Sequence, residues 1–441
     1  MNIQDFIANF HNHPVLFIGT GMSLRYLNNS YTWDDLLNKV SSDFIGNNEY
    51  YLDVKSKCEN GGSYDYPKIA SIIEKDFNDH LLKNRNGTFK HINDTFYENM
   101  EAGRNLSRFK IYLSEILGEI EINDEKRDEI KELRKIRKNI ASIITTNYDY
   151  FIEKVFQFNP LIGNDILLSN PYGAVYKIHG CVSDPSKIII TEEDYAFFKQ
   201  KYELIRAQLL SIFIHNPIIF IGYAIGDDNI KSLLKTIFSY VQPNSEQSRK
   251  IRENFLLVEY EKGSTSKTIT EHDIDLEGFS TIRINKIKTD DYVSIYKPLS
   301  DLTLPVSAMD IRKVQNVVKE IYSGGDIKVS ITEDLDALDN SDKIIAIGSH
   351  NTISYQYQSV SEIISNYFTI IDESNEQLLE LVNKHTIQTS QYFPIFAFSE
   401  INTDIEETER LKNQQEEKIN AALERVHDSC KSDNSSIDEI L

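Results

Sequence analysis

Cysteine is scarce in this chain, and its three copies are isolated from one another. Cys58, Cys181 and Cys430 form no CxxC pair and lie far apart in the sequence. This spacing argues against a disulfide framework and against a structural zinc site built on paired cysteines. We therefore expect no bound metal, zinc included, and a protein of the reducing cytoplasm.

Basic side chains are fewer than acidic ones. The 441 residues include 47 lysines and arginines against 68 aspartates and glutamates, which gives a formal net charge of −21. A nucleic acid would approach this molecule against a repulsive field, so any affinity for it would have to come from a local basic patch. We expect no direct nucleic-acid binding by this chain alone.

Long apolar runs are absent as well. The most apolar stretch, residues 209–226, is interrupted by His215, Asn216 and Pro217. Neither half reaches the ~20 residues that a helix needs to cross a bilayer. The first residues lack the basic start, apolar run and small-residue cleavage site of a signal peptide. The sequence predicts no membrane association.

What is present is the composition of a globular protein. Hydrophobic residues make up 40% of the chain and aromatic residues 11%. Short apolar segments alternate with segments of helical periodicity, which is typical of a parallel sheet covered by helices on both faces. Strands are predicted at residues 14–19, 140–147, 175–180, 187–191, 217–223, 255–260 and 280–285. We expect an α/β fold with a Rossmann-like sheet.

Helical patterns fill the segments between these strands. Asn2 is positioned to cap a first helix whose apolar residues recur at helical spacing. Residues 34–140 alternate charged and apolar positions at the same period, which predicts a large, mostly helical insertion. A further long helix is expected at 192–215.

The character of the sequence changes near residue 290. Residues 1–290 are predicted to form the sheet domain, with 34–140 as its insertion. Residues 291–441 are predicted to form a small C-terminal α/β and helical domain that serves assembly or partner binding. Within it, the charged segment 404–428 is expected to be a solvated helix.

The segment GTGMS follows the first predicted strand and opens a helix. Gly19 and Gly21 remove side chains where a backbone could approach a pyrophosphate, and Ser23 lies where the helix offers free N–H groups. The dinucleotide fingerprint G-x-G-x-x-G is incomplete, because Leu24 occupies its third glycine position. A plain tight turn between strand and helix explains the same residues.

Two further polar segments follow predicted strands. Thr145, Thr146, Asn147 and Asp149 lie at the carboxyl end of one strand, where ligands of open α/β sheets bind. His179 ends the next strand, beside a glycine, in an apolar context. Each has a purely structural explanation: Asn147 or Asp149 can cap the following helix, and His179 can be a satisfied core or turn residue.

The segment GYAIGDDNI, residues 222–230, forms another strand-turn-helix pattern. Gly222 leaves room for a ligand, and Tyr223 follows it directly. Asp227 and Asn229 are able to cap the next helix, which is the simpler role for both.

Together these segments resemble, in order and spacing, the sirtuin family of NAD-consuming proteins. The matches are Gly19-Thr20-Gly21-Met22-Ser23 to the family's G-A-G-x-S loop, Thr146-Asn147-Tyr148-Asp149 to Q-N-x-D, His179-Gly180 to H-G, and Gly222-Tyr223-Ala224 to G-x-S. The resemblance implies an NAD-binding set, with Asp227 and Asn229 as further candidates, that consists of Gly19, Thr20, Gly21, Met22, Ser23, Thr146, Gly222 and Tyr223. It also implies that Asn147 positions water and ribose, that His179 acts as a general base and that Asp149 fixes the nicotinamide side.

The residues after His179-Gly180 depart from the deacylating members of the family. Those proteins usually carry two CxxC pairs there, whereas this chain reads CVSDPSKIIITEEDY. The stretch instead resembles bacterial sirtuin-like proteins of anti-phage defence, and the tail from residue 290 resembles those paired with a HerA-type ATPase. The resemblance implies an NAD hydrolase that assembles as a homo-oligomer, is controlled by such an ATPase and depletes NAD in abortive infection.

Two other functions remain open at this point. The same motifs fit an NAD-dependent protein deacylase or ADP-ribosyltransferase. The large insertion and the C-terminal unit, which nucleotide chemistry does not require, fit a non-catalytic scaffold that senses NAD. NADP is not distinguished from NAD, because no acidic residue stands clearly ~20 residues past the glycine turn.

Overall fold

A computed structural model describes residues 1–168, 172–201, 203–223, 253–274, 282–323, 359–373, 381–388 and 390–425, together with residues 245, 246, 249 and 379. By its internal contacts the chain divides into two compact units, Met1–Ile311 and Arg312–Leu441. The predicted helix that would be capped by Asp227 and Asn229 lies outside the described residues.

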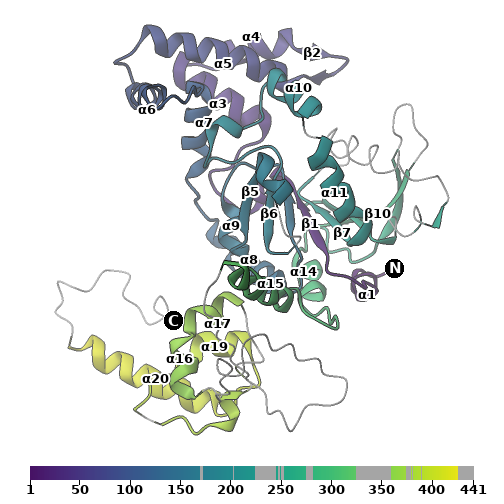
Figure 1. Cartoon of the computed structure of the whole chain (residues 1–441), viewed down its shortest axis with the longest axis vertical. Helices are drawn as coiled ribbons and strands as arrows, with labels where there is room; N and C mark the ends of the chain where they lie inside the picture. Colours follow the sequence, from purple (N-terminus) through teal and green to yellow (C-terminus); the bar gives the residue numbers. More distant parts are fainter. Residues whose placement is uncertain are drawn as a thin grey trace. The chain divides into compact units, whose positions relative to one another are not determined.

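An eight-stranded sheet forms the centre of the first unit (Figure 1). Its strands run in the spatial order β5-β6-β4-β1-β7-β8-β10-β9. Their bounds are Val15–Ile18 (β1), Ile143–Thr145 (β4), Asn159–Ile162 (β5), Ala174–Lys177 (β6), Ile218–Ile221 (β7), Phe255–Tyr260 (β8), Thr270–Ile274 (β9) and Ile282–Thr289 (β10). Every neighbouring pair is parallel except β9 and β10. The predicted α/β fold with a largely parallel, Rossmann-like sheet is confirmed.

Both faces of the sheet are buried, because alternate residues of each strand enter two different cores. Leu16 and Ile18 of β1 pack on one face with residues of α1 (Ile3–Ala8), α2 (Thr20–Tyr26) and α9 (Phe151–Phe156). Val15 and Phe17 pack on the other face against α11 (Glu203–His215). Asn2 caps α1 as expected, accepting a hydrogen bond from the Gln4 N–H at 3.1 Å.

The strand predicted at residues 187–191 does not form. A short 3₁₀ turn, Pro185–Lys187, leads into an extended segment whose Ile188 and Ile190 side chains enter the core of the insertion instead of the sheet. The missed strand β5 is a half-exposed edge strand with few apolar residues, and it contains Pro160, which edge strands tolerate. The helix predicted at 192–215 is described as α10 (Glu192–Lys201) and α11.

The insertion is helical, as predicted, and has its own apolar core. Its helices are Trp33–Ile45 (α3), Glu49–Lys57 (α4), Tyr66–Lys83 (α5), Lys90–Glu101 (α6) and Arg108–Gly118 (α7). Between α4 and α5 lies an antiparallel hairpin of two short strands, β2 (Glu59–Asn60) and β3 (Ser63–Tyr64). Figure 1 shows them gathered beyond one end of the sheet. The last helix of the predicted range, α8 (Arg127–Lys135), packs through Leu133 on the sheet's own core.

The first unit continues past the boundary predicted at residue 290. Helix α14 (Val293–Ser300) packs against α1 and α8, and Tyr292, Ile295, Tyr296 and Leu299 belong to the core of the sheet. The compact unit accordingly ends at Ile311.

The described part of the second unit is helical. Helix α15 (Ala308–Ser323) crosses the division between the units, and α16 (Val360–Ser365), α17 (Tyr367–Glu373), α19 (Ile395–Ile401) and α20 (Thr408–Leu423) follow. Ile363, Ile370, Ile395 and Phe398 are central in its core. Helix α20 corresponds to the solvated helix expected at 404–428. Residues 324–358, which fall in the predicted small α/β unit, lie outside the described residues.

The tight turn after β6 yields a stability prediction. Gly180 has a φ of +94°, and a Cβ there would lie 2.2 Å from the Lys187 carbonyl oxygen. Gly263 has a φ of +75°, but a Cβ at that position would meet no atom within 4 Å. We expect Gly263→Ala to lower the free energy of unfolding by about 1 kcal/mol from backbone strain alone, and Gly180→Ala by roughly 2–4 kcal/mol because the clash adds to the strain.

Urea unfolding followed by circular dichroism measures both free energies, with Gly263→Ala as the matched control. Equal losses in the two variants would show that the close approach of Lys187 to Gly180 does not constrain the turn.

Candidate functional site

The predicted segments converge on one pocket at the carboxyl edge of the parallel strands. The pocket has a volume of about 140 Å³. The sequence-predicted residues that line it are Thr20, Ser23, Thr146, Asn147, Asp149, His179, Gly222 and Tyr223. Gly19, Gly21 and Met22 do not line the pocket but lie directly behind it, and Asp227 and Asn229 lie outside the described residues. Segments that are far apart in the sequence therefore line one pocket in the folded chain.

The glycines of the first turn allow two backbones to touch. A Cβ on Gly19 would lie 2.6 Å from the Gly222 carbonyl oxygen, and one on Gly21 would lie 2.9 Å from the same atom. The N–H of Gly21 donates to that carbonyl at 2.9 Å. Met22 is completely buried in the core. The glycines therefore join the end of β1 to the end of β7, and Thr20 and Ser23 are the turn residues that face the pocket.

Asn147 sits at the centre of the site and is 6% exposed. Its amide nitrogen donates to the Gly19 carbonyl at 3.0 Å and to the Ser23 hydroxyl at 2.9 Å, and its backbone N–H donates to Thr145 Oγ1 at 3.0 Å. Its side-chain oxygen is buried and has no hydrogen-bond partner in the described structure. A buried acceptor without a partner is costly, so this atom is available to a ligand that can donate a hydrogen bond.

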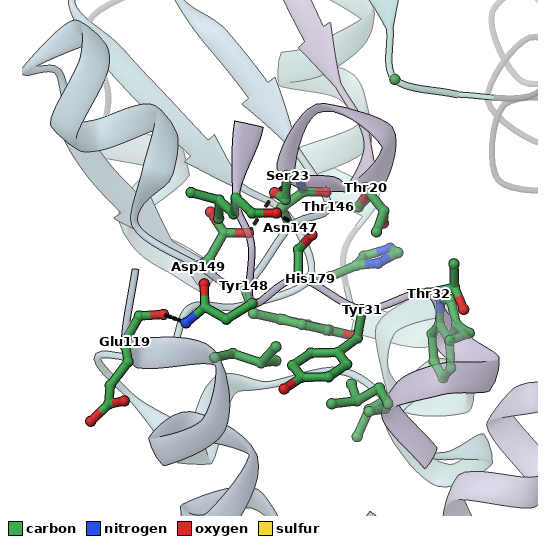
Figure 2. A pocket seen from close by; sticks show the side chains of 18 of the residues that line it. Thr20, Ser23, Tyr31, Thr32, Glu119, Thr146, Asn147, Tyr148, Asp149 and His179 are labelled. Atoms are coloured by element: carbon green, nitrogen blue, oxygen red, sulfur yellow. Dashed lines mark hydrogen bonds between the residues drawn. The ribbon is translucent and has the colours of Figure 1, made fainter. Parts of the chain in front are cut away.

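Asp149 uses both carboxylate oxygens within the protein. Oδ1 accepts from the Phe151 N–H at 2.9 Å, and Oδ2 accepts from the Ser23 hydroxyl at 2.7 Å. Figure 2 shows Asp149, Ser23 and Asn147 joined in this way on one wall of the pocket. The cap residue of α9 is Tyr150, but Oδ1 of Asp149 satisfies the first N–H of this helix, and Oδ2 orients Ser23.

His179 lines the pocket and is only 5% exposed. Its Nδ1 lies 3.4 Å from the Tyr195 hydroxyl, and its ring meets the rings of Tyr195 and Phe198 edge to face. Burial lowers the pKa of His179 to about 4, because the imidazolium form loses its hydration there. The ring is therefore neutral near pH 7 and has a lone pair to accept a proton.

Thr146 and Tyr223 close the pocket on the side of β7. The two hydroxyls lie 2.9 Å apart, and the Tyr223 hydroxyl also donates to the Ile18 carbonyl at 3.2 Å. This pair ties the ends of β4, β1 and β7 together beside the catalytic candidates.

Sequence reasoning missed the wall that the start of α3 and the insertion contribute. Tyr31, Thr32, Trp33 and Leu36 line the pocket, as does Leu117 from the end of α7. Figure 2 shows Tyr31 and Thr32 on the side facing Asn147 and Asp149. The only local signal was the cap of α3, where Thr32 Oγ1 accepts from the Asp35 N–H at 3.1 Å. A cap marks a helix start but not a pocket.

Neither a metal cluster nor a membrane span is found in the part of the chain that the structure describes. No three histidine, cysteine, aspartate or glutamate side chains there are grouped to hold a metal ion. No helix among the same residues combines the length and the apolar character needed to cross a bilayer. Cys181, next to Gly180, is a buried free thiol.

Comparison with known proteins agrees with this geometry. Residues 141–276 match the SIR2-like domain family. This range contains Asn147, Asp149 and His179 and leaves the glycine turn outside it.

Among curated proteins, the chain is similar to the NAD(+) hydrolase ThsA of Enterococcus faecium, with 29% identity over 38% of this chain and 39% of the relative. It is also similar to defense-associated sirtuin 2 of Bacillus subtilis, with 33% identity over 22% of this chain and 11% of the relative. The NAD(+) hydrolase ThsA of Acinetobacter baumannii is 26% identical over 34% of this chain and 32% of the relative. The chain thus matches well under half the length of these relatives and is a distant homologue of NAD hydrolases and a defence sirtuin.

Proposed function

We propose that this chain hydrolyses NAD at the bond between nicotinamide and ribose, releasing nicotinamide and ADP-ribose. The observation that carries this proposal is the buried side-chain oxygen of Asn147, which lacks a partner in the described structure and lies in the same pocket as a neutral, buried His179. The distant relatives named as NAD hydrolases support the same reaction.

Cleavage of this bond passes through a transition state with oxocarbenium character on the ribose. The Asn147 oxygen accepts a hydrogen bond from a ribose hydroxyl or from the attacking water. The water oxygen bonds to the anomeric carbon, the nicotinamide nitrogen leaves with the bonding electron pair, and His179 accepts the water proton. Asp149 is proposed to fix the nicotinamide side of the substrate, and its carboxylate also holds Ser23 in place.

The rest of NAD is proposed to bind along the turn Gly19–Ser23 and beside Thr146, Gly222 and Tyr223, with Asp227 and Asn229 further along the chain. The described lining of the pocket ends at Tyr223, and the residues that follow it, which include Asp227 and Asn229, lie outside the described residues.

For its biological role we propose NAD depletion in anti-phage defence, in a homo-oligomer controlled by a HerA-type ATPase. A hydrolase that is always active would drain the cofactor pool of its own cell, and the second unit, Arg312–Leu441, contributes none of its described residues to the pocket and is proposed to serve assembly. Nicotinamide release from NAD, measured by chromatography with and without such an ATPase, tests this. No nicotinamide under any condition contradicts the hydrolase. Turnover that requires an acylated peptide would identify a deacylase instead.

Substitution of the two central residues should abolish turnover without unfolding the protein. We expect Asn147→Ala and His179→Ala each to lower NAD turnover by at least roughly 10²-fold, because each removes a group that contacts the reacting atoms. Asn139 and His13 are matched controls, buried to the same degree but hydrogen-bonded away from the pocket.

In the controls Asn139→Ala and His13→Ala, we expect a lower thermal midpoint with turnover retained at temperatures where the variants stay folded. Wild-type turnover in either pocket variant would refute the role given to that residue.

The low pKa of His179 also predicts the pH dependence of turnover. A general base must be neutral, and burial keeps His179 neutral down to a pKa of about 4. We expect kcat/KM for NAD to stay nearly constant from pH 8 to pH 5 and to fall only as the pH approaches 4. A fall centred near pH 6.5 would contradict a buried base.

The free energy of unfolding must be measured at each pH, because the lowered pKa of His179 also makes the stability of the fold depend on pH. Below pH 6.5 the unfolded chain protonates this histidine while the folded chain does not until about pH 4. The contribution of His179 to stability therefore falls as the pH drops from 6.5 towards 4.

A further inference from the structure

Lys177, the last residue of β6, is a buried cation directly behind the pocket. Its side chain is 1% exposed, although it ends in an amino group that forms a salt bridge. It lies two residues before His179 in the sequence and does not line the pocket. Burying an ammonium group is expensive, and apolar residues of similar volume usually serve a core as well or better. Its presence at this position therefore points to a task other than filling the core.

Two contacts account for the charge of Lys177. Its Nζ lies 2.8 Å from Oε1 of Glu153 on α9, and Glu153 is itself only 10% exposed. The same Nζ donates a hydrogen bond to the backbone carbonyl of Asp149. The cation thus connects the strand that carries His179 with the loop that carries Asn147 and Asp149.

Two hydrogen bonds connect Asp149 through Ser23 to the side chain of Asn147, whose oxygen is the proposed contact to the ribose or to the attacking water. The Asp149 carboxylate accepts from the Ser23 hydroxyl at 2.7 Å, and the Ser23 oxygen accepts from the Asn147 amide nitrogen at 2.9 Å. The orientation of that amide decides where its unpartnered oxygen points. A shift of the Asp149 backbone would therefore move Ser23 and turn the Asn147 side chain.

We propose that Lys177 is a positioning residue that holds the loop from Thr146 to Tyr150 at the distance from His179 that NAD hydrolysis requires. This inference rests on the proposed function for its kinetic consequence, but its structural part does not depend on turnover. Small displacements of positioned groups are known to cost up to about 10²-fold in rate.

The alternative is an ion pair that only stabilises the fold, and the sheet contains a suitable comparison. Lys286 of β10 is 9% exposed in its side chain, and its Nζ lies 3.4 Å from Oε2 of Glu259 on β8. In the strand order, β8 and β10 lie on the opposite side of β1 from β6, and neither Lys286 nor Glu259 lines the pocket. Glu259 is 23% exposed and lies 3.4 Å from Lys288 Nζ as well, so these residues form a partly buried lysine–carboxylate cluster without a link to the site.

The experiment compares the double variant Lys177→Met with Glu153→Leu and the matched double variant Lys286→Met with Glu259→Leu. Replacing both partners avoids an unpaired buried carboxylate, and Lys288, which loses Glu259 in the second variant, is 47% exposed and remains solvated. Thermal unfolding of both variants checks that each is folded. For the first variant we expect a fall in kcat of about 10–100-fold with KM within threefold of wild type, because substrate binding groups remain. For the second we expect kcat within twofold of wild type.

Hydrogen exchange of the amides of residues 146–150 gives a readout that does not need NAD. We expect faster exchange there in the Lys177 variant and wild-type exchange in the Lys286 variant. Unchanged exchange at these amides would overturn the proposal, as would equal losses of kcat in the two variants. If the wild-type chain does not hydrolyse NAD but exchange still rises, the positioning role stands and the proposed function fails.

Discussion

The register of the parallel strands is the constraint on which the site depends. Ile18 at the end of β1 pairs with Thr145 of β4 and with Ile221 of β7, and Thr145 pairs with Lys177 of β6. Four strands therefore end at one level, and the residues that follow them emerge side by side. Parallel hydrogen bonding imposes this arrangement, because all carboxyl ends of such strands meet at one edge.

Close backbone contact and a buried ion cluster then hold the first turn in place. Only glycine at positions 19, 21 and 222 lets the turns after β1 and β7 touch, since a Cβ would come within 3 Å of backbone atoms. At the other end of α2, Arg25 forms ion pairs with Glu129 and with Asp290, the latter at 2.7 Å, and its guanidinium lies 4.1 Å from the centre of the Tyr292 ring. Ser23, between these anchors, has little freedom to move away from Asn147 and Asp149.

The insertion completes the site by removing water from it. Tyr31, Trp33 and Leu36 form the wall opposite the sheet, and the segment Ile188–Ile190 lies against the insertion core while the Ile189 N–H donates to the His179 carbonyl at 2.9 Å. Burial lowers the pKa of His179, whose ring meets Tyr195 and Phe198 of α10, and the Asn147 oxygen is buried without a hydrogen-bond partner in the described structure. The proposed chemistry is thus a joint product of the sheet and the insertion.

The sequence alone determined the strand-helix alternation, the capped first helix and the three polar segments after strands, because these features depend on local periodicity and on neighbours in the chain. It also predicted that Asn147, Asp149 and His179 would meet, since parallel strands share one edge.

Tertiary structure decided the rest. Residues 187–191 have the composition of a strand, yet their isoleucines pack into the insertion. Tyr31, Thr32, Trp33 and Leu36 line the pocket, although their local pattern indicates only a helix start. The partners of Lys177 are fixed by which elements pack behind the sheet, and no spacing along the chain reveals that.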